Sequence, residues 1–259
     1  MSESALVGPP RHKGIYLLPN LFTTGAMFAG FYAIIAGIDG RFTEAAISVF
    51  VAALLDGLDG RVARLTGTQT DFGVQYDSLS DLVSFGLAPA LVMYTWSLSA
   101  LAAFGEPWGK VAYAAAFIYA ACTALRLARF NTQVGVADKR YFQGLASPAA
   151  ASVCMSFVWS AEKAGFSGGD LCLVTPWIAV IAALLMVSRI RYFSFKSRAA
   201  GERQRVPFVW IVGAVLLFAL LVLDPARVLL VGFTLYLLSG PVWTVWGLAT
   251  HRRARRGTK

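Results

Sequence analysis

Long apolar runs separated by short, basic polar segments dominate this chain. Seven runs contain no charged residue, and they cover residues 14–38, 82–105, 111–125, 141–161, 171–188, 206–223 and 228–250. A helix needs about 20 apolar residues to cross a bilayer, and Lys or Arg side chains at the ends of a shorter run can reach the interface. An eighth candidate, residues 44–65, is apolar until it reaches Asp56. The pattern predicts an all-α polytopic membrane protein with about eight transmembrane helices.

Composition supports this interpretation. The 259 residues are 57% hydrophobic and only 14% charged, with a mean hydropathy of +0.62. Soluble domains carry about 25% charged residues. The length suits one polytopic domain, so we expect a cytoplasmic N-terminal segment at residues 1–13, a single transmembrane domain at 14–250 and a basic cytoplasmic tail at 251–259.

Lysine and arginine are distributed unequally between the two alternating sets of loops. One set, together with both terminal segments, holds most of the 23 basic residues, and the other holds only Arg41, Lys110, Lys163 and Arg227. Positively charged loops stay on the cytoplasmic side of a membrane. We therefore expect a multi-pass protein of the cell (inner) membrane, with both termini and the loop that follows residue 65 facing the cytoplasm.

The net charge of +9 raises the question of nucleic-acid binding. Because the basic residues flank apolar runs, their placement favours anionic lipid headgroups, which attract each such residue by about 1 kcal/mol. We expect membrane lipids as partners and no nucleic acid.

The segment from Asp56 to Asp81 places several carboxylates beside strongly apolar sequence, where an isolated charge is costly. Asp56 and Asp59 stand at i and i+3, and Asp77 and Asp81 at i and i+4, so each pair shares one face of a helix. The carboxylates can therefore converge, and their mutual repulsion favours a bound cation. Ligation by oxygen alone indicates a hard divalent ion, Mg²⁺ or Mn²⁺.

Eight positions of this segment form the pattern D-x2-D-G-x2-A-R-x8-G-x3-D-x3-D. They are Asp56, Asp59, Gly60, Ala63, Arg64, Gly73, Asp77 and Asp81. The pattern resembles the signature of the CDP-alcohol phosphotransferases, membrane enzymes that move a phosphatidyl-type group from a CDP-linked donor to an alcohol. A chance match of this many identities at fixed spacing is rare.

The resemblance implies roles for the motif residues. It implies two divalent metal ions, Mg²⁺ or Mn²⁺, at Asp56, Asp59, Asp77 and Asp81. It implies a CDP site made by Asp56, Asp59, Gly60, Ala63, Arg64, Gly73 and Asp77. Asp81 is expected to be the general base that accepts the alcohol proton, and CMP is released. Members of the family form homodimers, so a homodimer is expected here.

Two of these positions keep a structural interpretation beside the functional one. Gly73 could serve helix packing alone, because small residues let helices approach closely. Arg61, which lies within the motif but outside the pattern, could be an interfacial arginine whose charge reaches water.

The acceptor has to be inferred from other stretches. ALRLARFN (124–131) and FQGLASPAAA (142–151), with GIYLLPNLFTT (14–24) and RYFSFK (191–196), resemble the bacterial and archaeal membrane-type phosphatidylserine synthases. The resemblance implies CDP-diacylglycerol as donor, L-serine as acceptor, and phosphatidylserine and CMP as products. The usual Gly-Leu-Pro-Ser/Ala-Pro segment of these enzymes departs here, with Ala146 at the first proline position.

Serine needs a site for its carboxylate. Arg126 and Arg129, at i and i+3, could form a carboxylate clamp or bind phosphate, or they could simply end a span on the cytoplasmic side. Asn131, Gln143 and Ser147 could add polar contacts to the acceptor.

Two alternatives stay open at this point. The acceptor could be choline, glycerol 3-phosphate or an inositol compound within the same enzyme class. The chain could instead be a cation transporter, because carboxylates inside membranes also mark ion pathways. A transporter would have no need of Gly60, Ala63 and Arg64 at the observed spacing.

Overall fold

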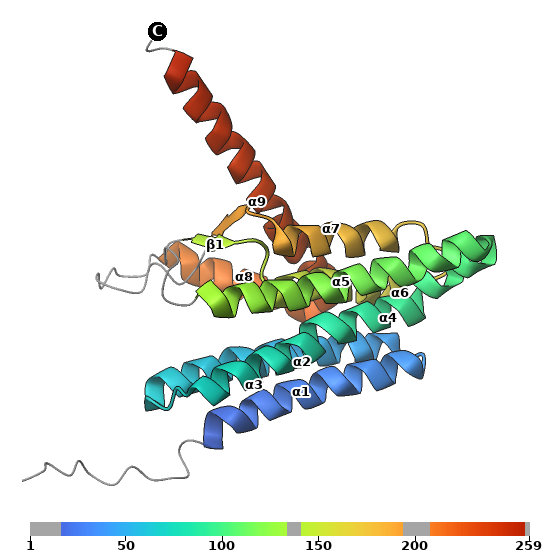
Figure 1. The fold of residues 1–259 in the computed structure, drawn as a ribbon, viewed down its shortest axis with the longest axis horizontal. Helices are drawn as coiled ribbons and strands as arrows, with labels where there is room; N and C mark the ends of the chain where they lie inside the picture. Colours follow the sequence, from blue (N-terminus) through green and yellow to red (C-terminus); the bar gives the residue numbers. More distant parts are fainter. Residues whose placement is uncertain (1–16, 134–140, 194–207, 257–259) are drawn as a thin grey trace, which may run out of the picture.

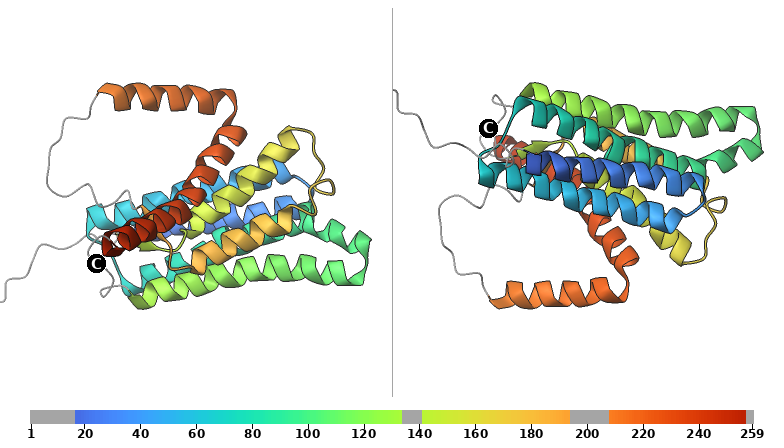
Figure 2. Two further views of the ribbon diagram at one scale, coloured as in Figure 1. Left: turned by 90° about the horizontal axis from the view of Figure 1, so that it is seen from above. Right: turned by 90° about the horizontal axis from the view of Figure 1, so that it is seen from below.

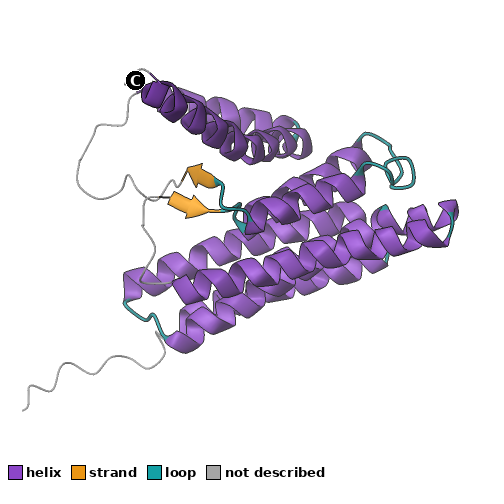
Figure 3. Cartoon of the chain, turned by 45° about the horizontal axis from the view of Figure 1, so that its top comes forward, coloured by secondary structure: helices purple, strands orange, loops and turns teal. Residues whose placement is uncertain are grey.

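The computed structural model describes residues 17–133, 141–193 and 208–256, and this part of the chain is almost entirely helical (Figure 1). Its helices are α1 (Leu17–Ile38), α2 (Phe42–Thr66), α3 (Asp71–Asp81), α4 (Ala88–Trp96), α5 (Glu106–Gln133), α6 (Ser147–Lys163), α7 (Thr175–Val187), α8 (Phe208–Leu223) and α9 (Pro225–Arg256). A π-helical turn, η2 (Leu82–Leu87), joins α3 to α4, and a 3-10 segment, η3 (Leu98–Phe104), precedes α5. Figure 3 shows one short antiparallel ribbon beside the helices, made by β1 (Tyr141–Gln143) and β2 (Arg191–Phe193).

Helix length and composition in the described ranges agree with the prediction of a mainly helical membrane protein. Within these ranges, four helical stretches are long and apolar enough to cross a membrane: Leu18–Ile38, Asp71–Trp96, Glu106–Thr132 and Pro225–Thr244. Helices α7 and α8 are apolar but shorter.

One predicted apolar run begins differently from the expectation. Residues 141–161 were expected to be helical throughout, but Tyr141–Gln143 pair with β2 and the helix begins only at Ser147. The reason is local, because Gly144 adopts a positive φ of 82° and Pro148 favours the first turn of a helix.

Small side chains let the first helices pack closely. Ala33 and Ala36 of α1 and Ala45 and Ala46 of α2 are all fully buried in the core. At Gly30 of α1, an added Cβ would lie 2.6 Å from the Ser84 Cα in η2. Close contact of this kind replaces the hydrophobic driving force that is weak between helices in lipid.

The connections between helices gather at two opposite ends of the bundle (Figures 1 and 2). The α2–α3 turn lies at the end where β1 and β2 also lie. The α1–α2 connection, the start of α5 and the α6–α7 loop lie at the other end, and they carry Arg41, Lys110 and Lys163. The acidic motif therefore lies at the end opposite to the sparsely basic loops.

Helix α8 stands apart from the bundle in Figure 2, and none of its residues is buried. It meets α9 at a sharp bend, and an ion pair connects this bend to α6. The Lys163 ammonium lies 3.0 Å from an Asp224 carboxylate oxygen, which lowers the pKa of that carboxyl. The surface of α8 is apolar all round, as expected for a helix surrounded by lipid.

Gly144 is the residue that shapes the entry to α6. Its N–H donates to the Ile190 carbonyl at 2.8 Å, and a Cβ here would collide with the Met186 carbonyl oxygen. We expect Gly144→Ala to destabilise the protein by about 2 kcal/mol or more, because it adds both positive-φ strain and a backbone clash. Thermal unfolding in detergent measures the loss. Gly213→Ala in α8, where a Cβ meets nothing within 4 Å, is the matched control, and an equal effect there would contradict the argument.

Candidate metal centre and active site

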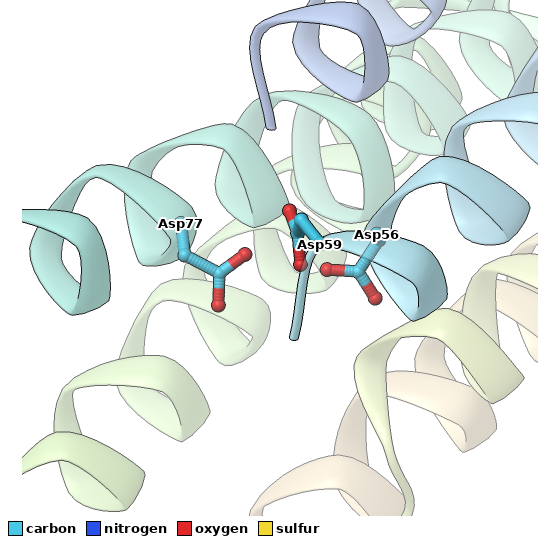
Figure 4. A group of neighbouring side chains, drawn as sticks. All are labelled: Asp56, Asp59 and Asp77. Atoms are coloured by element: carbon cyan, nitrogen blue, oxygen red, sulfur yellow. The ribbon is translucent and has the colours of Figure 1, made fainter. Parts of the chain in front are cut away.

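Three carboxylates from two helices converge beside the α2–α3 turn. Asp56 and Asp59 project from α2 and Asp77 from α3, and one oxygen of each lies within 4.8 Å of those of the others. Figure 4 shows the three side chains directed toward a common space. The predicted i, i+3 spacing thus places Asp56 and Asp59 on one face of α2, the face turned toward Asp77.

The turn between the two helices follows from its sequence. Gly67 ends α2 in the left-handed conformation, with a φ of 62°. Thr70 begins α3, because its hydroxyl oxygen accepts a hydrogen bond from the Gly73 N–H at 3.0 Å. Such a cap satisfies one of the free N–H groups at a helix start. The chain therefore reverses in a few residues and brings Asp77 back beside Asp59.

The acidic triad (Asp56, Asp59 and Asp77) fits a divalent cation. Asp59 is 5% exposed, and the buried Oδ1 of Asp77 has no hydrogen-bond partner within the described part of the chain. Asp77 also feels the charges of both Asp56 and Asp59. Three neighbouring carboxylates that repel one another, one of them with a buried oxygen that no donor among the described residues reaches, are stabilised by a cation, and ligation by oxygen alone suits Mg²⁺ or Mn²⁺.

Asp81 lies next to the triad without being part of it. It is the last residue of α3, one turn after Asp77, and it interacts electrostatically with Asp56 and Asp77. It also interacts electrostatically with the cationic side chain of Arg126 in α5. Asp81 is therefore a carboxylate set between the acidic triad and an arginine.

The remaining motif residues lie on the same two helices as the triad, α2 and α3. Arg64 is exposed near the end of α2, and its Nε donates to the Gly60 carbonyl at 2.7 Å. Ala63 lies in the same turn of α2. At Gly73 an added Cβ would lie 3.1 Å from Thr70 Oγ1, so this position has little room for a side chain.

Two of the five predicted acceptor residues, Arg126 and Ser147, are hydrogen-bonded to each other. Arg126 Nη1 donates to Ser147 Oγ at 2.5 Å, which joins α5 to the start of α6 beside Asp81. Arg129 Nη1 donates to the Val187 carbonyl at 3.4 Å instead. Asn131 exchanges hydrogen bonds with Ser78 of α3, at 2.9 Å for its own N–H. Gln143 stands in β1, and its side chain lies outside the described part of the structure.

The structure adds two residues that the sequence did not single out. Thr23 of α1 is buried and donates to Asp59 Oδ2 at 2.7 Å. Tyr236 of α9 interacts electrostatically with Arg126, and its ring lies 5.6 Å from that of Tyr192 in β2. Thr23 could have been noticed in the sequence as a hydroxyl-bearing residue within an apolar run. Nothing in the sequence distinguishes Tyr236, because aromatic residues are common in membrane helices.

Comparison with known proteins places this arrangement in context. Residues 16–188 match the model of the CDP-alcohol phosphatidyltransferase family. A CDP-diacylglycerol–serine O-phosphatidyltransferase of Helicobacter pylori is 38% identical over 182 residues, which cover 70% of this chain and 74% of the relative. An enzyme of the same name from Methanocaldococcus jannaschii is 34% identical and covers 64% of this chain and 71% of the relative. An archaetidylserine synthase of Methanothermobacter thermautotrophicus is 34% identical over 68% of this chain and 69% of the relative.

Proposed function

The chain belongs to the CDP-alcohol phosphatidyltransferase family, and on that premise we propose that it transfers a phosphatidyl group from CDP-diacylglycerol to L-serine, giving phosphatidylserine and CMP. The observation that carries the proposal is the convergence of Asp56, Asp59 and Asp77 beside Asp81 and Arg126. The names of the relatives support serine as the acceptor, since enzymes that act on serine recur among them in both bacteria and archaea.

Asp81 is proposed to be the general base. As the serine oxygen forms a bond to the phosphatidyl phosphorus, its proton passes to the Asp81 carboxylate, and the bond from phosphorus to the CMP oxygen breaks with its electron pair leaving on CMP. A carboxylate serves as a base only while it is ionised, so the proposed step requires a deprotonated Asp81 when serine is bound.

The acidic triad is proposed to hold the metal ions that the family signature implies. Asp56, Asp59 and Asp77 would supply the ligands for two divalent cations, Mg²⁺ or Mn²⁺, and Asp81 is predicted to touch one of them. When bound, the cations neutralise the pyrophosphate and the developing charge on CMP. Gly60, Ala63, Arg64 and Gly73 are proposed to shape the CDP site around the triad.

The acceptor end is proposed to lie at Arg126. Its guanidinium is fixed by Ser147, and a fork of N–H donors suits the carboxylate of serine. Tyr236 adds a phenol on the side of α9. Arg129, Asn131 and Gln143 stay predictions as acceptor contacts.

The same proposal includes a membrane topology. Eight crossings would place both termini and the acidic site on the cytoplasmic side of the cell (inner) membrane, in accordance with the unequal distribution of Lys and Arg. The division into segments 1–13, 14–250 and 251–259 belongs to this proposal, as does a homodimer surrounded by membrane lipids.

The test of the function is CMP release by purified protein with CDP-diacylglycerol and Mn²⁺ or Mg²⁺. Serine is compared with choline, glycerol 3-phosphate and inositol. We expect turnover with serine. Turnover with another acceptor alone would keep the family and refute serine. Cation flux without CMP release would favour the transporter alternative.

Arg126→Lys tests the acceptor end. Lysine keeps the charge but loses the planar fork, so we expect the KM for serine to rise about tenfold, a loss within the range of a charged hydrogen bond. The KM for CDP-diacylglycerol should stay unchanged. Arg41→Lys is the matched control, because Arg41 lies at the opposite end of the bundle and pairs with Asp39 and Glu44. A rise in the KM for CDP-diacylglycerol instead would assign Arg126 to the donor phosphates.

A further inference from the structure

Helix α1 bears none of the motif residues, yet it contacts both helices that do. Thr23 Oγ1 lies 2.7 Å from Asp59 Oδ2, and both residues are buried, at 4% and 5% exposure. The same hydroxyl lies 3.1 Å from the Pro19 carbonyl, which is the local partner of a threonine inside a helix. Because a hydroxyl has one proton, the shorter bond to the charged carboxylate is the stronger of the two.

Thr23 and its neighbour also hold α3. Ser80 Oγ donates to the Thr23 carbonyl at 3.1 Å, and Ser80 directly precedes Asp81. The hydroxyls of Thr24 and Tyr76 lie 2.9 Å apart, and Tyr76 directly precedes Asp77. One short segment of α1 therefore fixes a carboxylate of α2 and the backbone position of α3.

We infer that Thr23 is a positioning residue of the acidic triad, which orients the Asp59 carboxylate for a divalent cation while α1 sets the distance between α2 and α3. The inference rests on the proposed function, in which the triad holds the metal. Fixing Oδ2 fixes the plane of the whole carboxylate, so both of its oxygens take defined directions. Hydrogen-bond partners of metal ligands commonly change metal affinity by about 10–100-fold when they are removed.

The packing of α1 on α2 does not depend on this hydroxyl. The helices meet through buried alanines further along, at Ala33 and Ala36 of α1 and Ala45 and Ala46 of α2. Valine has nearly the shape of threonine, so Thr23→Val removes the hydrogen bond and leaves the packed volume in place. A purely structural role would leave metal affinity unchanged in that variant.

Direct binding of Mn²⁺ to the purified full chain in detergent, without substrates, tests the inference. The free ion is counted by its electron paramagnetic resonance signal. We expect Thr23→Val to weaken Mn²⁺ binding about 10–100-fold and Thr23→Ser, which keeps the hydroxyl, to restore it. Ser84→Ala is the matched control. Ser84 is buried and donates to the Ala26 carbonyl of α1 at 3.0 Å, so its loss also removes a buried bond to α1 but touches no carboxylate.

Several results would overturn the inference. One is a Thr23→Val variant that binds Mn²⁺ with wild-type affinity, and another is an equal loss of Mn²⁺ affinity in Thr23→Val and Ser84→Ala. A Thr23→Ser variant that binds Mn²⁺ as weakly as Thr23→Val would also overturn it, as would a wild-type protein that binds no Mn²⁺. Thermal unfolding without metal shows that each variant is folded. The binding comparison needs no turnover, so failure of serine-dependent CMP release in the wild type is a separate outcome that bears on the proposed function alone.

Discussion

Replacing Asp81 with Asn is expected to reduce serine-dependent CMP release by about 10²–10⁴-fold, the range for loss of a positioned general base. Asparagine fills the same space and can still accept a hydrogen bond, but it cannot take the proton of the attacking hydroxyl. The effect should therefore fall on kcat. The measurement is the initial rate of CMP release at saturating CDP-diacylglycerol and serine.

Metal binding separates the two roles considered for Asp81. Because Asp81 lies outside the acidic triad and would touch only one of the two cations, Asp81→Asn should keep most of the wild-type Mn²⁺ affinity while losing turnover. Asp71→Asn is the matched control, since Asp71 is an exposed aspartate in the first turn of the same helix, and it should retain wild-type rates. A loss of Mn²⁺ binding as large as that in Asp77→Asn would make Asp81 a principal ligand, and unchanged turnover would remove it from the reaction.

Asp77→Asn is expected to have opposite effects on stability with and without metal. Without a cation, the charge of Asp77 faces those of Asp56 and Asp59, and its Oδ1 is buried with no donor among the described residues. Removing that charge should stabilise the metal-free protein by about 1 kcal/mol, which raises the melting temperature by roughly 2–4 °C for a chain of this size. The rise that Mn²⁺ produces in the wild type should be lost.

Activity should fall with the loss of the ligand. We expect Asp77→Asn to lower the rate of CMP release by roughly 100-fold or more. This is more than the effect of removing a hydrogen-bond partner of a metal ligand, such as Thr23. Thermal unfolding with and without Mn²⁺, together with the rate, gives all three quantities, and Asp71→Asn again controls for loss of one negative charge from α3. A variant that is still stabilised by Mn²⁺ to the wild-type extent would show that Asp77 is not a ligand.

The convergence of the aspartates could be predicted because it depends on short-range geometry. The spacings i, i+3 and i, i+4 fix a helix face, whereas the roles of Gly67 and Thr70 in the turn became evident only in the structure. The same spacing placed Asp81 on the face of Asp77, and in the structure Asp81 lies outside the triad but interacts electrostatically with Asp56 and Asp77, so its role as a metal ligand stays a prediction.

Contacts that depend on tertiary packing could not be predicted from the motif. Thr23 reaches Asp59 across 36 positions of the chain, and Tyr236 approaches Arg126 from a helix beyond the segment that matches the family model. The β1–β2 ribbon was missed because each strand has only three residues, too few to produce a periodic pattern. Helix packing decides which side chains complete a site, and this packing cannot be inferred from composition or from residue spacing.

The π-helical turn between Leu82 and Leu87 sets the rotation of α4 relative to α3. A π-turn contains one residue more than an α-turn, so it rotates the side chains after it by about 100° relative to an uninterrupted helix. The face that carries Asp77 and the face that buries Val92 and Met93 therefore take a fixed relative orientation that an uninterrupted helix could not give them.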